Sequence, residues 1–226
     1  MRCAMHSAIE IRFGGAQLVL DGSGVLFWPQ HGLLVVSDLH FEKASFLAQH
    51  GSLIAPYDTM DTLLRLQAVV QHYQPRELVL LGDSLHDANA WQRLDAALRQ
   101  QLAALVAQVQ HCRWIEGNHD VVLRGPDTPL LEAQYEQGGI AFRHEYAALQ
   151  LPQIIGHYHP KSSLVWNRQK VRGRCFVHSD TLLVMPAFGS FTGGLEISDP
   201  AFQRLFTEPA RMQVHLLYKN KLYKCP

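Results

Sequence analysis

Residues 33–40 read LLVVSDLH, so four apolar residues run directly into Ser37, Asp38, Leu39 and His40. A short apolar run of this kind predicts a buried β-strand. Asp38 and His40 are two positions apart, and both side chains leave on the same side if the chain stays extended after the strand. The pair indicates either the start of a metal site or acid–base pair, or an aspartate that caps the next helix beside a packed histidine. Matching residues elsewhere in the chain would favour the first interpretation.

The composition suits one globular domain. The chain has 226 residues, of which 47% are hydrophobic and 18% charged, enough to bury a sizeable core. The formal net charge is +0, so no overall field attracts nucleic acid or an anionic membrane, and such binding needs a local patch. We find no secretion signal, no bilayer-spanning run and no Cys-x-x-Cys spacing. We expect a single domain over residues 1–226, a cytoplasmic location, reduced cysteines and no membrane partner.

Strand and helix patterns alternate in the first half of the chain. The expected strands are a hairpin over 9–20 and single strands at 25–28, 33–36, 77–81 and 112–115. The expected helices are 42–50, 58–73 and 89–109. The buried face of the second helix is predicted from helical spacing to comprise Met60, Leu63, Leu64, Leu66, Val69 and Val70. This alternating order calls for parallel strands covered by helices.

Short strands dominate after Asp120. They are expected at 140–148, 153–155, 163–165, 174–178, 181–185 and 214–218, with one short helix near 199–206. This pattern predicts a second, mostly antiparallel sheet packed against the first. The fold class is therefore α/β with two stacked sheets.

Five apolar runs in this chain each end in polar residues that can bind a metal. Ligands of α/β sheets bind at the carboxyl ends of the strands, so all five ends converge if the strands share one sheet system. Carboxylate, amide oxygen and imidazole suit a borderline-hard divalent ion, and the number of donors is enough for two ions with one bridging carboxylate. The seven candidates are Asp38, His40, Asp83, Asn118, His144, His157 and His159.

The ordered motifs Asp-x-His, Gly-Asp, Gly-Asn-His-Asp, a single His and Gly-His-x-His resemble those of the calcineurin-like metallophosphoesterase superfamily, over residues 33–160. The longer stretches SDLHFEK, GDSLHD, RHEY and MPAFGSFTGG are similar to the bacterial ligase-associated DNA damage response endonucleases (PdeM-like), up to Glu196. The resemblance implies a four-layer metallophosphoesterase fold, in which two stacked mixed β-sheets are flanked by α-helices.

The resemblance also implies a role for each candidate. The first metal would be held by Asp38, His40 and His159. The second would be held by Asn118, His144 and His157. Asp83 would bridge the two ions, which we expect to be manganese, although iron or zinc suits the same ligands. His119 would be the catalytic histidine that faces the phosphate, and Asp120 would orient it through its second ring nitrogen.

Substrate contacts are open to two interpretations. His86 either contacts the substrate phosphate or bonds only to its own loop. Four cations alternate and would share one face of an extended chain, as a track for nucleic-acid phosphates or as a solvated hairpin edge. They are Arg168, Lys170, Arg172 and Arg174.

We therefore expect a two-metal-dependent phosphoesterase that hydrolyses phosphodiester bonds. The resemblance favours a DNA endonuclease linked to DNA repair, with repair proteins such as a ligase or a helicase as partners. One alternative is a phosphodiesterase or phosphatase acting on a nucleotide or other small phosphoester. A second is a non-catalytic scaffold that the metals merely stabilise. The sequence does not predict the oligomeric state.

Overall fold

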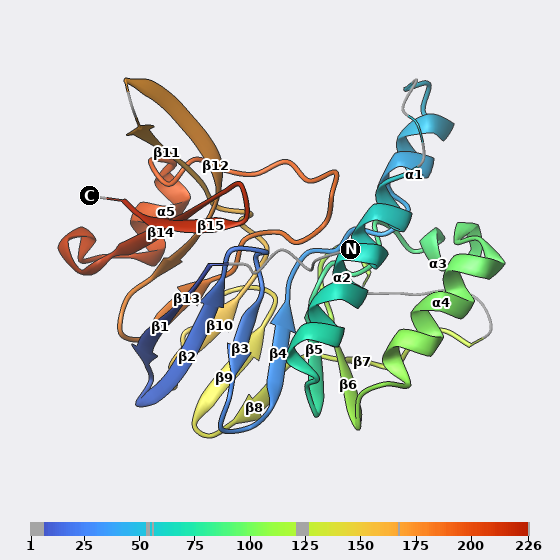
Figure 1. Ribbon diagram of the computed structural model, residues 1–226, viewed down its shortest axis with the longest axis horizontal. Helices are drawn as coiled ribbons and strands as arrows, with labels where there is room; N and C mark the ends of the chain where they lie inside the picture. The colour runs from blue at the N-terminus through green and yellow to red at the C-terminus, as the bar shows by residue number, and fades with distance from the viewer. Residues whose placement is uncertain (1–6, 53–54, 56, 121–126, 167, 226) are drawn as a thin grey trace.

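Two mixed β-sheets stack face to face, with helices on their outer sides (Figure 1). The computed structural model describes residues 7–52, 55, 57–120, 127–166 and 168–225. Helices α2 and α4 cover the first sheet, and α5 covers the second. This arrangement confirms the predicted four-layer α/β architecture. No helix in these residues is long and apolar enough to cross a bilayer.

The first sheet has seven strands in chain order. They are β1 (Ala8–Phe13), β2 (Ala16–Asp21), β3 (Leu26–Trp28), β4 (Leu33–Val36), β5 (Glu77–Leu81), β6 (His111–Ile115) and β7 (Leu131–Glu132). Pairing is antiparallel from β1 to β4 and parallel from β4 to β7. All four residues of β4 are buried, as expected for a strand covered on both faces.

The second sheet has eight strands, with the order β15-β14-β12-β13-β10-β9-β8 and β11 paired to β12. They are β8 (Tyr135–Gln137), β9 (Ile140–Arg143), β10 (Gln153–Ile155), β11 (Lys161–Trp166), β12 (Gln169–His178), β13 (Leu182–Val184), β14 (Gln213–Tyr218) and β15 (Lys221–Lys224). β10 runs parallel to β9 and β13, and the other pairs are antiparallel. β9 ends at Arg143 and not at the predicted 148.

The core has three parts, and β4 contributes to two of them. Leu33 and Val35 pack between the sheets, whereas Leu34 and Val36 pack against α2 (Asp58–Tyr73). The third part lies between the second sheet and α5 (Pro200–Leu205). Burial on both faces fixes β4 firmly, so the residues after its carboxyl end have a rigid support.

The predicted helix over 89–109 is wrong, because the structure divides it into α3 (Ala90–Arg93) and α4 (Ala96–Val106). Leu94 leaves the helical conformation with ψ 121°. Asp95 then caps α4, since its side chain accepts a hydrogen bond of 2.8 Å from the Ala97 N–H. A short acidic side chain competes for backbone donors in this way and starts a new helix. The remaining helices are α1 (Lys43–Gln49) and the 3₁₀ turn Pro209–Arg211.

The ends of α2 agree with the prediction, but its buried face is only partly correct. Met60 and Leu64 are 43% and 55% exposed, whereas Thr59 and Thr62 are buried. Thr59 Oγ1 accepts a 2.8 Å hydrogen bond from the backbone of the loop before α1, and Thr62 Oγ1 accepts one of 3.0 Å from Ser190 N–H. Both threonine hydroxyls have hydrogen-bond partners within the protein, so the face of α2 that carries them is buried and the face that carries Met60 is exposed.

Candidate metal centre

The five apolar runs do end at one place. β4, β5 and β6 are parallel neighbours in the first sheet, and β9 and β10 are parallel neighbours in the second. The loops that follow these strands bring all seven candidate ligands together, as the contacts below show. The prediction of convergence is therefore confirmed, and it follows from the direction of the strands.

The first group of donors contains Asp38, His40, Asp83 and His159, whose ligand atoms all lie within 4.8 Å of one another. His159 Nε2 is 3.1 Å from Asp38 Oδ1 and 3.3 Å from His40 Nε2. His40 Nε2 is 3.7 Å from Asp83 Oδ2. Two carboxylates and two imidazoles aimed at one point form a donor set that fits a divalent cation.

The second group contains Asn118, His144 and His157. Asn118 Oδ1 is 3.0 Å from both His144 Nε2 and His157 Nδ1, and these two nitrogens are 3.2 Å apart. His144 Nε2 is 3.4 Å from Asp83 Oδ2, the oxygen that also faces His40. Asp83 therefore borders both groups through a single oxygen atom.

Left-handed backbone, not an extended chain, directs these side chains. The φ angles are 54° at Asp38, 47° at His40, 46° at Asp83, 68° at His157 and 45° at His159. The sequence-based reason for the convergence of Asp38 and His40 is therefore wrong, although the convergence itself is correct. Aspartate and histidine adopt this region more readily than most residues, yet each such position costs about 1–3 kcal/mol.

Two glycines in the loops after β5 and β6 leave space for the ligands. A Cβ on Gly117 would lie 2.3 Å from Asp83 Oδ1 and 2.1 Å from its backbone nitrogen. A Cβ on Gly82, whose φ is 75°, would lie 2.1 Å from His144 Nδ1. Only glycine permits these approaches of backbone to ligand.

The site favours positive charge. Burial alone would raise the pKa of the Asp38 carboxyl, but the neighbouring histidines, His159 above all, hold it below its usual value. Burial alone would also raise the pKa of Asp83, but His144, the His119 N–H and His40 together outweigh burial and lower it. Burial lowers the pKa of His144, but Asp83 and Asp38 outweigh it and raise the value to about 9. Burial lowers the pKa of His40 to about 3, so its imidazole is neutral and able to bind a metal.

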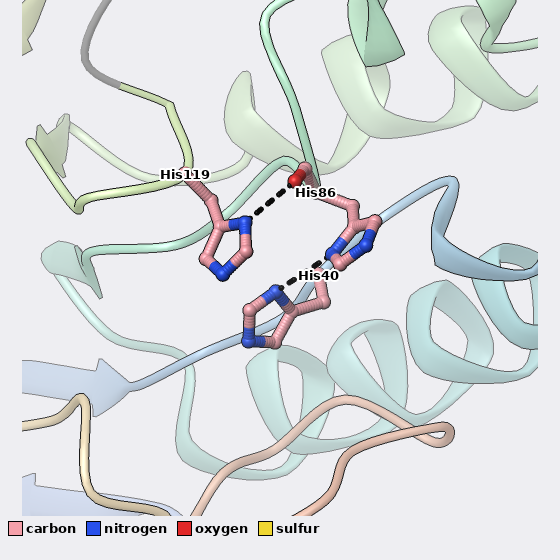
Figure 2. Close-up of side chains that lie close together, drawn as sticks. All are labelled: His40, His86 and His119. Atoms are coloured by element: carbon pink, nitrogen blue, oxygen red, sulfur yellow. Dashed lines mark hydrogen bonds between the residues drawn. The ribbon is translucent and has the colours of Figure 1, made fainter. Parts of the chain in front are cut away.

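A cluster of three histidines borders the first group (Figure 2). His119 Nδ1 is 2.8 Å from the carbonyl oxygen of His86, and the two rings stack with centres 4.9 Å apart. His86 Nδ1 is 3.4 Å from His40 Nδ1. His119 Nε2 lies 4.0 Å from Asp83 Oδ2, and the side chain is 40% exposed. His119 thus borders the donor atoms and is open to a ligand from solvent, and His86 contacts His40 as well as its own loop.

The predicted role of Asp120 in orienting His119 is wrong. Asp120 is fully buried, and its carboxylate accepts hydrogen bonds of 2.7 Å from Gly117 N–H and 2.7 Å from Ser84 N–H. His119 instead uses Nδ1 to contact the His86 carbonyl. Asp120 therefore joins the loops that follow β5 and β6, because backbone N–H groups occupy both of its oxygens.

The four alternating cations do not form one open face. Arg168 lies in the turn between β11 and β12 with φ 63°, and Lys170 is exposed on β12. Arg172 forms an ion pair with Glu196. Arg174 is partly buried, and its Nη1 donates hydrogen bonds to backbone carbonyls, including one of 2.7 Å to Ala187. A track of four free cations, one of the two interpretations of this run, is therefore not formed, since Arg168 lies in the turn and Arg172 and Arg174 have partners within the protein.

Two neighbours of the centre were not predicted. Ser37 Oγ donates a 2.5 Å hydrogen bond to Asp38 Oδ2, and its place before that aspartate is the signal that pointed to it. Glu145 Oε1 lies 3.6 Å from His157 Nδ1 and forms a possible donor group with His144 and His157. Adjacency to His144 was the only sequence signal for Glu145.

The sequence model for calcineurin-like phosphoesterases matches residues 32–221, most of the chain. The chain belongs to this family. The calcineurin-like phosphoesterases are hydrolases that use divalent metals, so the predicted metal-dependent phosphoesterase is confirmed, and the donor groups above give it clusters able to hold such ions. No curated protein matches the chain.

Two solved structures are similar to this chain. The crystal structure of Pseudomonas putida nuclease MPE is 25% identical, with a TM-score of 0.72, and the match covers 97% of this chain and 100% of that one. A conserved uncharacterized protein of Streptococcus pneumoniae TIGR4, described as a predicted phosphoesterase, is 15% identical with a TM-score of 0.31. That match covers 85% of this chain and 95% of the other.

Proposed function

We propose that this phosphoesterase hydrolyses phosphodiester bonds in DNA. The observation that carries the proposal is the match, over nearly the whole length of both chains, to a solved structure named a nuclease. A role in DNA repair, with a ligase or a helicase as partner in the cytoplasm, is an expectation that rests on the resemblance of the motifs.

We assign three ligands to each of two ions. The first ion would be held by Asp38, His40 and His159. The second would be held by Asn118, His144 and His157. Asp83 would bridge them, which is supported by the short distances from its Oδ2 to donors of both groups. Manganese is the expected ion, with iron or zinc as alternatives, because the donors are oxygen and imidazole nitrogen without a thiolate.

Two bound ions would neutralise charge on the phosphoester and lower the pKa of a water molecule. His119 supplies the other part of the chemistry. Its Nδ1–H donates to the His86 carbonyl, which leaves Nε2 facing Asp83 and the open side of the centre. His119 Nε2 is therefore the atom that would contact the substrate phosphate or, with the ring protonated at both nitrogens, give its proton to the leaving oxygen.

The substrate is tested with manganese-loaded protein on plasmid DNA, linear DNA, mononucleotides and cyclic nucleotides, ranked by kcat/KM. Asp83→Asn is the matched control, since it changes one oxygen at the centre. We expect DNA cleavage that this control loses. Efficient turnover of nucleotides, with no DNA cleavage above the control, would overturn the DNA proposal while leaving the phosphoesterase assignment intact.

A small phosphoester is the second candidate substrate, favoured by one observation. The formal net charge is +0, and two of the four cations in the β11–β12 hairpin already have partners. Affinity for DNA depends mainly on neutralised phosphates, so few free cations predict weak DNA binding. The same ranking by kcat/KM separates the two candidates.

A further inference from the structure

A cavity of about 320 Å³ lies outside the metal centre, where the β2–β3 turn, α2, β12 and the β14–β15 turn meet. Among the described residues, its lining contains three cationic side chains and no carboxylate. The cations are Arg65, Arg174 and Lys219. Val69 and Leu217 supply an apolar wall.

The two arginines carry charge that is poorly compensated. Among the described residues, Arg174 has no ion pair, and its Nη1 donates to the carbonyls of Ala187 and Phe188. Arg65 Nη2 donates a 2.7 Å hydrogen bond to the same Phe188 carbonyl, and its Nη1 lies 3.9 Å from Asp61. Burial, with the nearby charge of Arg65, lowers the pKa of Arg174 to about 10. One exposed carboxylate thus lies near two partly buried cations.

Ser23, whose hydroxyl is unpaired in the described part of the chain, is one of the residues that line the same cavity. Ser23 Oγ is buried and, within the residues that the structure describes, has no hydrogen-bond partner. The nearby carboxylate of Asp21 accepts instead from Ser23 N–H and from Tyr73 Oη, each at 2.7 Å. A buried hydroxyl with no partner is unfavourable, so a ligand that accepts its hydrogen bond would be stabilising.

Lys219 stands at the exposed side of the cavity. It lies in the β14–β15 turn, and its ammonium group is 5.2 Å from the centre of the Tyr218 ring. Guanidinium forks, an ammonium group and a hydroxyl are together the donors that bind phosphate oxygens.

We propose that this cavity binds a phosphate-type oxyanion, either as the free ion or as the monoester group of a small metabolite. Its volume of about 320 Å³ is at the lower end of the range typical of small-ligand pockets. The segment 187–190 separates the cavity from the metal centre. On the side of the centre, Phe188 N–H donates to the Ser37 carbonyl and Gly189 N–H to the Asp38 carbonyl. On the side of the cavity, the two arginines donate hydrogen bonds to the Phe188 carbonyl.

Calorimetric titration of manganese-loaded, full-length protein with inorganic phosphate tests the proposal. We expect two phosphates per chain, one at the metals and one in the cavity. Asp83→Asn should lose the first and keep the second, which separates this site from the proposed function. Lys219→Ala should weaken the second about tenfold, the value of one charged hydrogen bond. Lys221→Ala is the matched control, since it removes an equal charge from β15 outside the cavity lining.

Adenosine 5′-monophosphate, titrated into the Asp83→Asn protein to prevent turnover, distinguishes the two forms of the ligand. Tighter binding than phosphate identifies the monoester, and equal binding identifies the free ion. Ser23→Ala is the second variant, because it removes the unpaired hydroxyl without a change of charge. The proposal is overturned if Asp83→Asn binds no phosphate, or by equal affinities in Lys219→Ala, Ser23→Ala and the Lys221→Ala control.

Discussion

Asp83 borders both donor groups through one oxygen atom, its Oδ2. Its Oδ2 lies 3.7 Å from His40 Nε2 and 3.4 Å from His144 Nε2, while Oδ1 accepts a 2.9 Å hydrogen bond from His119 N–H. His40, by contrast, contacts the first group only. In the proposed two-metal centre, this side chain would couple the two ions, and its Oδ1 also fixes the backbone of the candidate catalytic histidine.

Removal of His40 or Asp83 should therefore affect metal content differently. We expect His40→Ala to retain about one ion per chain, since the second group keeps all its donors. Asp83→Ala should retain close to none after desalting. Elemental analysis of manganese in the purified proteins measures both. Equal metal content and equal residual turnover in the two variants would contradict the bridging role.

His119 should act on turnover and not on metal binding. Loss of a residue that transfers a proton or contacts the phosphate typically reduces kcat by about 10²–10⁴-fold. We expect such a loss in His119→Ala at unchanged manganese content, measured with bis-p-nitrophenyl phosphate as substrate. His111→Ala, at an exposed position on β6, is the matched control. Unchanged turnover in His119→Ala would refute this role.

The convergence of the candidate ligands could be predicted from the sequence because each of them lies shortly after an apolar run, whereas their hydrogen-bond partners could not. Asp120 is next to His119 in the chain, yet it bonds to Gly117 and Ser84, because loop geometry turns it inward. The left-handed φ at Asp38 was also beyond prediction, since this conformation depends on the tertiary contacts of the loop.

The loops after β5 and β6 depend on each other, because they are joined through Asp120.

The prediction of helices from the sequence is limited in the same way, by contacts between elements. The ends of α2 were predictable from its flanking residues, but its rotation depends on two threonines that find partners in other elements. The break between α3 and α4 depends on one capping aspartate in an otherwise helical sequence.

Asp120→Asn should lower stability without changing metal content directly. An amide would place an NH₂ group against a backbone N–H donor, and an unsatisfied buried donor costs about 1–3 kcal/mol. A fall in Tm of roughly 2–4 °C for each kcal/mol is expected in thermal unfolding. Asp95→Asn is the matched control, because asparagine also caps helices well and should leave Tm nearly unchanged. An unaltered Tm in Asp120→Asn would contradict its structural role.

Stacked layers place five strand ends around one point, and the whole fold therefore brings buried charge to its centre. The predicted layers were correct because apolar periodicity determines which faces are buried, and the order of elements limits the topology. One domain over residues 1–226 remains our proposal. In one cooperative domain, the residues at the centre unfold together with the rest of the molecule, so their ionisation should influence global unfolding.

Metal-free protein should be most stable near pH 6.5. The pKa of His144 is raised to about 9, so its contribution is fully present below its ordinary value of 6.5 and is lost as the pH rises through 9. The pKa values of His40 and His86 are lowered to about 3 and about 4, so their contributions are present above 6.5 and are lost as the pH falls. The Tm, measured with a chelator present, should therefore fall both above and below pH 6.5.

His144→Gln provides the check on the alkaline side. Glutamine keeps a polar side chain of similar size but does not titrate, so the fall in Tm between pH 6.5 and 9 should disappear in this variant. The fall in Tm below pH 6.5 should remain in this variant, since His40 and His86 are unchanged. A wild-type Tm that is constant from pH 6.5 to 9 would show that His144 does not carry this charge.

Five candidate ligands have a left-handed backbone, so the residues that would serve hydrolysis also lower the stability of the folded chain. Glycine at Asp38 or Asp83 would relieve the conformational penalty, yet it would remove a donor from the centre. Selection for a robust fold alone would favour such replacements, and only selection for hydrolysis opposes them. Directed evolution for thermostability without an activity screen should therefore replace residues of this centre first. A descendant no longer selected for hydrolysis would become more stable and inactive.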